Sequence, residues 1–111
     1  MTTESLTFTF QALADPTRRA ILERLTAGET SVMDLAGPFR ISLPAITKHL
    51  KVLERAGLIT RTREAQWRPC HLAPGPLAEA LAWLEPYRRH WEARLDRLEE
   101  HLAAMNELEE P

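Results

Sequence analysis

The stretch that decides the fold is Ser42-Leu43-Pro44-Ala45-Ile46-Thr47-Lys48-His49-Leu50-Lys51-Val52-Leu53-Glu54-Arg55-Ala56-Gly57, which has the features of one complete helix. Ser42 is a preferred N-cap residue, and Pro44 follows it where a missing N–H costs little. Gly57 suits the position just beyond a helix, because glycine adopts a left-handed conformation without strain. The stretch therefore predicts a helix from residue 43 to residue 56.

The two sides of this predicted helix differ in chemistry. Ile46, Leu50 and Leu53 fall within roughly 40° of one another on a helical wheel, so we expect them to be buried. The opposite, outward face carries Pro44, Lys48, Lys51 and Arg55, flanked by Ala45, Thr47 and Val52. A solvated helix more often mixes both signs of charge, whereas cations gathered on one face suit contact with phosphates.

The residues before this helix predict three shorter helices. The first covers about residues 6–14, and Asp15-Pro16 ends it. Asp15 is the expected N-cap of the second helix, with Pro16 at its first position, and this helix ends at Gly28. In the second helix we expect the buried residues to be Ile21, Leu22 and Leu25. Ser31 opens a third helix, whose apolar face carries Val32, Leu35, Ala36 and Phe39.

After Gly57 the pattern changes from helix to strand. Residues 58–63 and 67–72 are rich in β-branched and alternating residues, and Glu64-Ala65-Gln66 joins them as a hairpin. Pro69 cannot donate a ladder hydrogen bond, so we expect the second strand to lie at an edge of the sheet. We expect Pro74-Gly75-Pro76 to end the hairpin.

Basic side chains are concentrated in the middle of a chain whose net charge is −2. Residues 40–68 carry seven Lys and Arg against two Asp and Glu, which gives +5, while residues 69–111 carry four against nine. Such a local excess is typical of contact with a phosphate backbone. Charge alone is equally well explained by a solvated face without a partner.

Two helices joined by a short turn and followed by a hairpin predict a winged helix-turn-helix, mainly α with a small β-hairpin. In such a fold the second helix enters the DNA major groove, and the hairpin arginines suit the adjacent minor groove or backbone. The predicted DNA-binding residues are Ser42, Pro44, Ala45, Thr47, Lys48, His49, Lys51, Arg55, Arg61, Arg63 and Arg68. His49 lies about 60° from the centre of the buried face, which leaves open whether it packs or contacts DNA.

The C-terminal residues form a heptad pattern over about four repeats from Leu77 onward. Pro86 interrupts it, so we expect a short helix to about Glu85 and a longer one from Pro86 to about Leu108. An apolar stripe of this length is large for a monomer, so we expect a homodimer to bury it. The predicted interface residues are Phe8, Phe10, Leu77, Leu81, Leu84, Tyr87, Trp91, Leu95, Leu98 and Leu102.

The length of 111 residues suits one structural domain, with a DNA-binding part at residues 1–73 and a helical dimerisation segment at residues 74–111. No apolar run approaches the roughly eighteen residues of a membrane span. The N-terminus has neither a basic region nor a long apolar region, so we expect no secretion signal. A single cysteine, Cys70, fits the reducing cytoplasm, where we expect the protein.

Two motifs give the chain a family resemblance. Ala12-Leu13-Ala14-Asp15-Pro16-Thr17-Arg18-Arg19-Ala20-Ile21-Leu22 resembles the opening signature of the ArsR/SmtB winged-helix repressors, and Ser42–Ile59 resembles their recognition helix and entry to the wing. The resemblance implies a cytoplasmic homodimer that represses transcription from pseudo-palindromic DNA operators. It also implies that Ser42, Ala45, Thr47, Lys48 and Lys51 lie in the groove. One departure is that the hairpin turn, Glu64-Ala65-Gln66, lacks the glycine usual in these proteins.

Many proteins of this family release DNA when they bind a metal, but the residues required for that are missing here. The stretch Ser31–Ala36 has no paired cysteines, and one thiol cannot form a soft-metal site. His90 and His101 have the spacing of the second site type, yet its flanking positions hold Arg88 and Ala104. We therefore expect no metal site and no cofactor. A small-molecule effector, for example in a pocket at the aromatic residues Trp83, Tyr87 and Trp91, stays an alternative to plain core packing.

Two other classes of function compete with a DNA-binding repressor. A winged-helix protein–protein module without DNA binding predicts a neutral or acidic recognition face, which this sequence does not have. An enzyme is not expected, because no glycine-rich phosphate loop, metal cluster or nucleophile with a base is recognisable. Cys70 and His71 are neighbours on a predicted strand, so their side chains point to opposite faces and do not form a catalytic pair.

Overall fold

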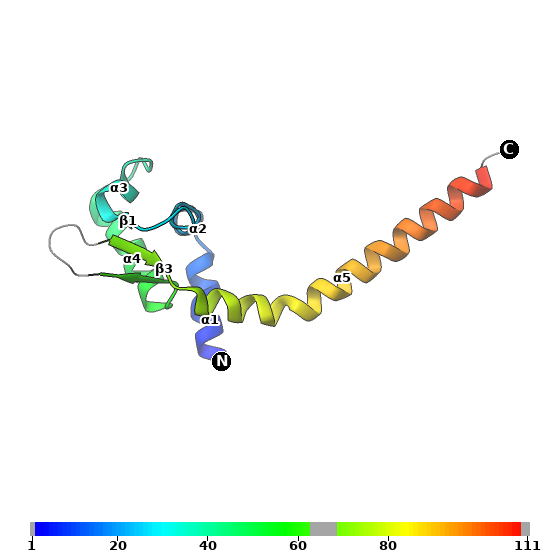
Figure 1. Cartoon of the computed structure of the whole chain (residues 1–111), viewed down its shortest axis with the longest axis horizontal. Coiled ribbons are helices and arrows are strands. Elements are labelled where there is room, and N and C mark those ends of the chain that lie inside the picture. Colours follow the sequence, from blue (N-terminus) through cyan, green and yellow to red (C-terminus); the bar gives the residue numbers. More distant parts are fainter. Residues whose placement is uncertain (1, 63–68, 110–111) are drawn as a thin grey trace. The chain divides into compact units, whose positions relative to one another are not determined.

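The computed structural model describes residues 2–62 and 69–109, and these form five helices and three short strands (Figure 1). In chain order they are α1 (Thr3–Leu13), α2 (Pro16–Leu25), β1 (Thr30–Ser31), α3 (Val32–Ala36), α4 (Leu43–Arg55), β2 (Ile59–Arg61), β3 (Pro69–Leu72) and α5 (Pro74–Glu109). The chain divides into two compact units, one ending at Ala80 and the other beginning at Leu81. The predicted fold class, a mainly helical winged helix-turn-helix with a long C-terminal helix, is confirmed.

Short polar side chains fix the starts of the first four helices. The backbone N–H of Arg18 donates to Asp15 at 3.0 Å, and that of Ala45 donates to Ser42 at 3.3 Å. Ser31 caps α3 in the same way, and Thr2 caps α1. Each cap satisfies an N–H group that has no partner inside its helix. The three caps predicted from the sequence are therefore confirmed.

Gly57 turns the chain from α4 into β2. The N–H groups of Gly57 and Leu58 donate to the carbonyls of Glu54 and Leu53, both at 3.0 Å, which closes the helix end. Gly57 has a φ of +75°, which favours glycine, and a Cβ at this position would lie 3.3 Å from Cγ of Pro76. The backbone conformation therefore favours glycine here, and a Cβ would also require Pro76 to shift by a few tenths of an ångström.

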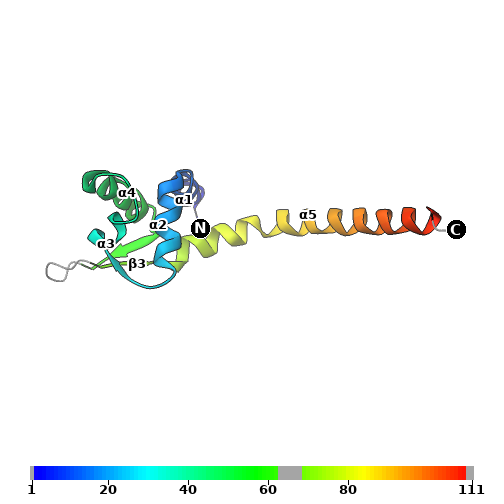
Figure 2. The same cartoon turned by 90° about the horizontal axis from the view of Figure 1, so that it is seen from above.

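Helix α4 contacts α1, α2, α3 and β2 within the first unit. In Figure 2 it lies above α3 and to the left of α1. Ile46, Leu50 and Leu53 are completely buried, as the helical wheel predicts. They share one core with Ala12, Ile21, Leu22, Leu25, Leu35, Leu58, Ile59 and Cys70. Burial of the whole apolar face fixes which face of α4 points outward.

The sheet is antiparallel and has the strand order β1-β3-β2. The prediction that the second hairpin strand lies at an edge is wrong, because β1, a strand the sequence analysis did not predict, pairs with β3 on its other side. Pro69 stands opposite Ser31 at the first residue of β3, where a proline is tolerated. Its carbonyl accepts a hydrogen bond from Thr62 at 3.1 Å, so Pro69 still takes part in the sheet.

Helix α5 is continuous from Pro74 to Glu109, which corrects two predictions. The hairpin ends before Pro74, as predicted, but the helix already begins at Pro74 and not at Leu77. Pro74 and Pro76 are tolerated in its first turn because the N–H groups there have no helical partner in any case. The predicted break at Pro86 is absent. Pro86 removes one hydrogen bond, to the carbonyl four residues earlier, and the neighbouring turns continue the helix across it.

None of the helices in residues 2–62 and 69–109 combines the length and the apolar content that crossing a membrane requires.

Candidate nucleic-acid interface

The outward face of α4 presents three cations. Lys48, Lys51 and Arg55 are exposed, and none of them forms an ion pair with another residue of the described ranges. Ala45 and Thr47 are half-buried beside them. The arrangement is an exposed cationic surface on a helix whose opposite side cannot move without disrupting the core.

The N-terminal turn of α4 is largely satisfied by its own cap. Ala45 donates its N–H to the Ser42 hydroxyl, Ile46 donates to the Ser42 carbonyl, and Pro44 has no N–H. The Thr47 hydroxyl donates to the Leu43 carbonyl at 3.0 Å, and its oxygen can still accept. Attraction for an anion at this face therefore comes chiefly from the lysine and arginine side chains.

His49 points to the corner between α1 and α2. Its Nδ1 lies 3.7 Å from a carboxylate oxygen of Asp15 and 3.5 Å from Nη1 of Arg18. Arg18 also donates to the carbonyls of Ala12 at 2.7 Å and Gln11 at 2.9 Å, in the C-terminal turn of α1. His49 is thus packed against this corner, and its contact with DNA stays a prediction.

Asp15 is the anionic centre of that corner. The hydrogen bond from the Arg18 backbone N–H lowers the pKa of Asp15; partial burial opposes the shift, and the charges of His49 and Arg18 add to it. The capping role of Asp15 is predicted from the sequence, whereas the role of Arg18 is not. The available signal was an arginine in the first turn of α2, next to a helix end whose carbonyls need donors.

The predicted wing is described only in part. Arg61 lies on β2, half-buried and paired with Cys70 across the sheet, whereas Arg63, Arg68 and the turn Glu64-Ala65-Gln66 lie outside the described residues. At the base of the wing, Nε2 of His71 lies 3.2 Å from both the Glu29 carboxylate and the Thr62 hydroxyl.

Cys70 and His71 face different surroundings, as the strand alternation predicts. Cys70 is completely buried in the core, and burial raises the pKa of its thiol. His71 is half-buried at the surface between Glu29 and Thr62. A thiol and an imidazole so placed do not act on one another.

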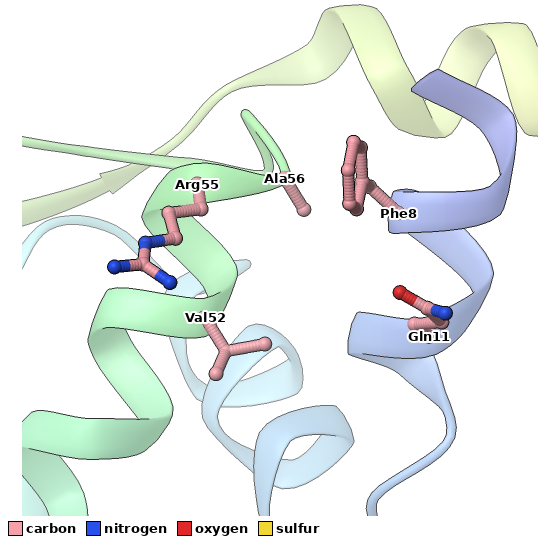
Figure 3. Close-up of a pocket in the computed structure, with 5 residues that line it drawn as sticks. All are labelled: Phe8, Gln11, Val52, Arg55 and Ala56. Carbon is pink, nitrogen blue, oxygen red and sulfur yellow. The ribbon is translucent and has the colours of Figure 1, made fainter. Parts of the chain in front are cut away.

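A pocket of about 480 Å³ lies beside the C-terminal half of α4. Figure 3 shows Phe8 and Gln11 of α1 on one side and Val52 and Ala56 on the other, with Arg55 at its border. Phe8, which lines this pocket, is a predicted interface residue and is 55% exposed. The pocket is mainly apolar and adjoins one of the three outward cations.

The predicted interface residues of α5 differ in their burial. Leu77 is half-buried and packs against the core of its own chain. The rest are exposed in the single chain: Leu81, Leu84, Tyr87, Trp91, Leu95, Leu98 and Leu102. In α5, the rings of Trp83 and Tyr87 contact each other at a tilt of 40°, with centroids 5.0 Å apart.

In the part of the chain that the structure describes, no three or more His, Cys, Asp or Glu side chains are grouped so that they could hold a metal ion.

Comparisons with known proteins point to one family. The sequence profile of a helix-turn-helix domain family matches residues 13–62. The chain is 37% identical over 75 residues to the transcriptional repressor SdpR of Bacillus subtilis (strain 168), which covers 68% of this chain and 83% of SdpR. The chain belongs to the ArsR/SmtB family of helix-turn-helix transcriptional regulators.

Solved structures agree with the assignment to the ArsR/SmtB family. The crystal structure of the ArsR family transcriptional regulator RHA00566 matches with a TM-score of 0.76 and 41% identity, over 83% of this chain and 95% of that one. The homodimeric winged helix-turn-helix DNA-binding domain of Mb0332 from Mycobacterium bovis matches with a TM-score of 0.63 and 25% identity, over 81% of this chain and 84% of that one. This ArsR/SmtB chain is therefore a DNA-binding transcriptional regulator, and the prediction of a regulator instead of an enzyme is confirmed.

Proposed function

We propose that this chain represses transcription by binding, as a homodimer, to a pseudo-palindromic DNA operator. The observation that carries the proposal is the outward face of α4, where Lys48, Lys51 and Arg55 are exposed and without ion-pair partners in the described residues. A helix of this kind enters the major groove. The acidic remainder of the chain concentrates attraction for DNA at this face.

The side chains of this face divide into two roles. Lys48, Lys51 and Arg55 neutralise phosphates, which fixes the orientation of α4 on the duplex. Thr47 and Ala45 are short enough to approach base edges, where a hydroxyl bonds to a base and a methyl group meets thymine. Ser42 and Pro44 border the groove at the start of α4. The hairpin residues Arg61, Arg63 and Arg68 contact the adjacent minor groove or backbone.

His49 contributes indirectly. Because its imidazole is directed at Asp15 and Arg18, it ties α4 to the α1–α2 corner and so sets the angle at which the outward face is presented.

A single module reads only half of a symmetric operator. A homodimer presents two copies of α4 about 34 Å apart, on successive turns of one DNA face. Support for the homodimer comes from the exposed apolar side chains of α5 and from the homodimeric Mb0332 domain.

The proposal is tested by selecting genomic fragments of the source organism that bind the full chain, then titrating the selected fragment with salt. The affinity is expected to fall steeply as salt rises, because binding releases counterions. Lys48→Ala and Lys51→Ala are each expected to reduce the slope of log K against log salt by about 0.9. Arg24→Ala, which removes an exposed cation of α2, is the matched control. A shallow slope, or two lysine variants that bind like the control, would overturn the proposal.

We further infer that DNA release in this protein does not depend on a metal. His90 has Arg88 two residues away, and that guanidinium is bound to Glu85 and Glu92 on the same helix, so it repels a cation and occupies the nearest carboxylates. Adding Zn²⁺ or arsenite to the preformed complex with the selected fragment is expected to leave its affinity unchanged. A tenfold or greater loss of affinity that a chelator or thiol reverses would contradict this.

A further inference from the structure

The pocket between α1 and α4, called the α1–α4 pocket below, opens where the core ends. Ala12 of α1 is completely buried, whereas Phe8, one turn earlier on the same helix, is 55% exposed. On the other side of the pocket, Val52 of α4 is 38% exposed. Figure 3 shows Ala56 of α4 directed toward the Phe8 ring. Apolar side chains therefore line a space of about 480 Å³, a size typical of small-molecule sites.

Both walls of the α1–α4 pocket are held in place. Arg18 fixes the C-terminal turn of α1, because it donates to the Gln11 carbonyl at 2.9 Å and lies 3.5 Å from the imidazole of His49 on α4. Leu53, the neighbour of Val52 in the chain, is completely buried and anchors α4 in the core. The space between the two helices is therefore formed without a ligand, as it is in most ligand sites.

The charged residue in the lining of this pocket is Arg55, and none of the described residues that line it is acidic. The guanidinium of Arg55 is exposed and has no ion-pair partner in residues 2–62 and 69–109. In Figure 3 it extends away from Phe8, so it must turn to meet an anion between the helices. Gln11 extends from α1 toward the same space, where its side-chain amide supplies N–H donors. These polar groups suit a single negative charge.

We propose that the α1–α4 pocket binds a small amphipathic carboxylate, whose apolar body lies against Phe8, Val52 and Ala56 and whose carboxylate is bound by Arg55. A guanidinium forms two parallel hydrogen bonds with a carboxylate, which makes arginine well suited to this anion. Burial of the apolar body stabilises the complex further. The ligand is thus a monocarboxylate with an aromatic or branched alkyl body.

Ligand and DNA compete for the same guanidinium. This step rests on the proposed function, in which Arg55 neutralises a phosphate of the operator. When the guanidinium turns into the pocket and pairs with a carboxylate, it is lost to the phosphate. Each partner therefore lowers the affinity of the chain for the other by the same factor. The carboxylate is an effector that weakens the hold of the repressor on its operator.

Ligand binding is tested in the absence of DNA, by isothermal titration calorimetry of the full chain with naphthoate and with its neutral analogue naphthamide. Naphthoate is expected to bind saturably and roughly tenfold more tightly than naphthamide, because its hydrogen bonds to Arg55 are charge-assisted. Arg55→Gln should remove this preference for the anion. Ala56→Leu, which fills the pocket and keeps Arg55, should weaken both probes by roughly tenfold. Arg24→Gln removes the same charge from α2, outside the pocket, and is the matched control.

The effect on DNA is measured by fluorescence anisotropy of the selected genomic fragment, with and without saturating naphthoate. In the wild type, naphthoate should raise the DNA dissociation constant by roughly tenfold. In Arg55→Gln and in Ala56→Leu, it should change that constant by less than about twofold. The comparison is made within each variant, so a change in the DNA affinity of the variant itself cancels.

Each result has a distinct meaning. Saturable binding of naphthoate that both pocket variants weaken supports the site. Absence of saturable binding, or binding that neither variant changes, overturns the site and leaves the DNA-binding function intact. Binding that weakens as the protein is concentrated shows that a second copy of the chain fills the pocket, and it overturns the site as well. Binding at the site without loss of DNA affinity overturns the effector role. Failure of the proposed function is seen separately, in the salt slope.

Discussion

Helices α4 and α5 are both amphipathic, but α4 has its apolar face covered by its own chain and α5 beyond Ala80 does not. Leu50 of α4 is 0% exposed, whereas Trp91 and Leu98 of α5 are 61% and 52% exposed. The charges differ as well. The cations of α4 lie opposite its apolar face, whereas Glu92, Arg94 and Glu99 of α5 border its apolar stripe.

The difference separates the two tasks of the molecule. A helix whose apolar face is completed within one chain holds its outward face still, and that face is free for a ligand of opposite charge. A helix whose apolar face is left open requires another surface to cover it. The loss of stability caused by a core substitution in α4 should therefore not depend on protein concentration, whereas the loss caused by a substitution in the apolar stripe of α5 should depend on it.

The largest effect is expected in the core under α4. Leu50→Ala should destabilise the first unit by about 2–5 kcal/mol, because it leaves a cavity among fully buried side chains. Denaturant unfolding followed by circular dichroism measures the change. Val52→Ala, on the same helix but at the surface, should cost less than about 1 kcal/mol. Equal costs at both positions would contradict the packing described for α4.

The next effect concerns α5 and should depend on concentration. Leu98→Ala removes two leucine side chains from a dimer contact, so the dimer dissociation constant should rise about hundredfold. The thermal midpoint of the variant should approach that of the wild type as both are diluted. Leu108→Ala, at the exposed end of α5, is the control. A cost that is the same at all concentrations would show that the stripe is covered within one chain.

The smallest effect is expected at the corner that holds His49. Asp15→Ala removes the cap of α2 and the carboxylate beside His49, and should lower Tm by about a few degrees at neutral pH. The pKa of Asp15 is lower in the folded chain than its ordinary value of 3.8, so its contribution is present above that pH. The contribution is lost as the pH falls through the lowered folded pKa.

Thermal melts from neutral to acidic pH test this prediction. The difference in Tm between the wild type and Asp15→Ala should shrink once the pH falls below the ordinary aspartate pKa. Glu23→Ala, an exposed substitution within α2, should show little difference at any pH. A difference between wild type and Asp15→Ala that stays constant down to the lowest pH would contradict the charge-based role.

The features that the sequence predicts well are those set by neighbouring residues. Ser42 and Gly57 define the ends of α4 through local hydrogen bonds, and the spacing of its leucines defines the buried face. These signals lie within a few residues of the structure they determine. The same holds for Asp15 and Ser31 as caps.

The features that the sequence misses depend on distant partners. Thr30–Ser31 forms a strand because it pairs with β3, so the strand propensity of these two residues alone does not predict it. The contact between Arg18 and His49 joins residues 31 positions apart. Pro86 was expected to break α5, but one lost hydrogen bond does not outweigh the many that remain in a helix of 36 residues.

The thiol of Cys70 gives the protein a natural reporter of its own opening. Its sulfur is shielded in the middle strand and is harder to ionise than an exposed cysteine, so an alkylating reagent should label it only when that strand separates from the helices. Because the chain has a single cysteine, the labelling rate needs no engineered probe. The decrease in labelling rate when DNA is added would measure directly how much DNA binding stabilises the folded domain.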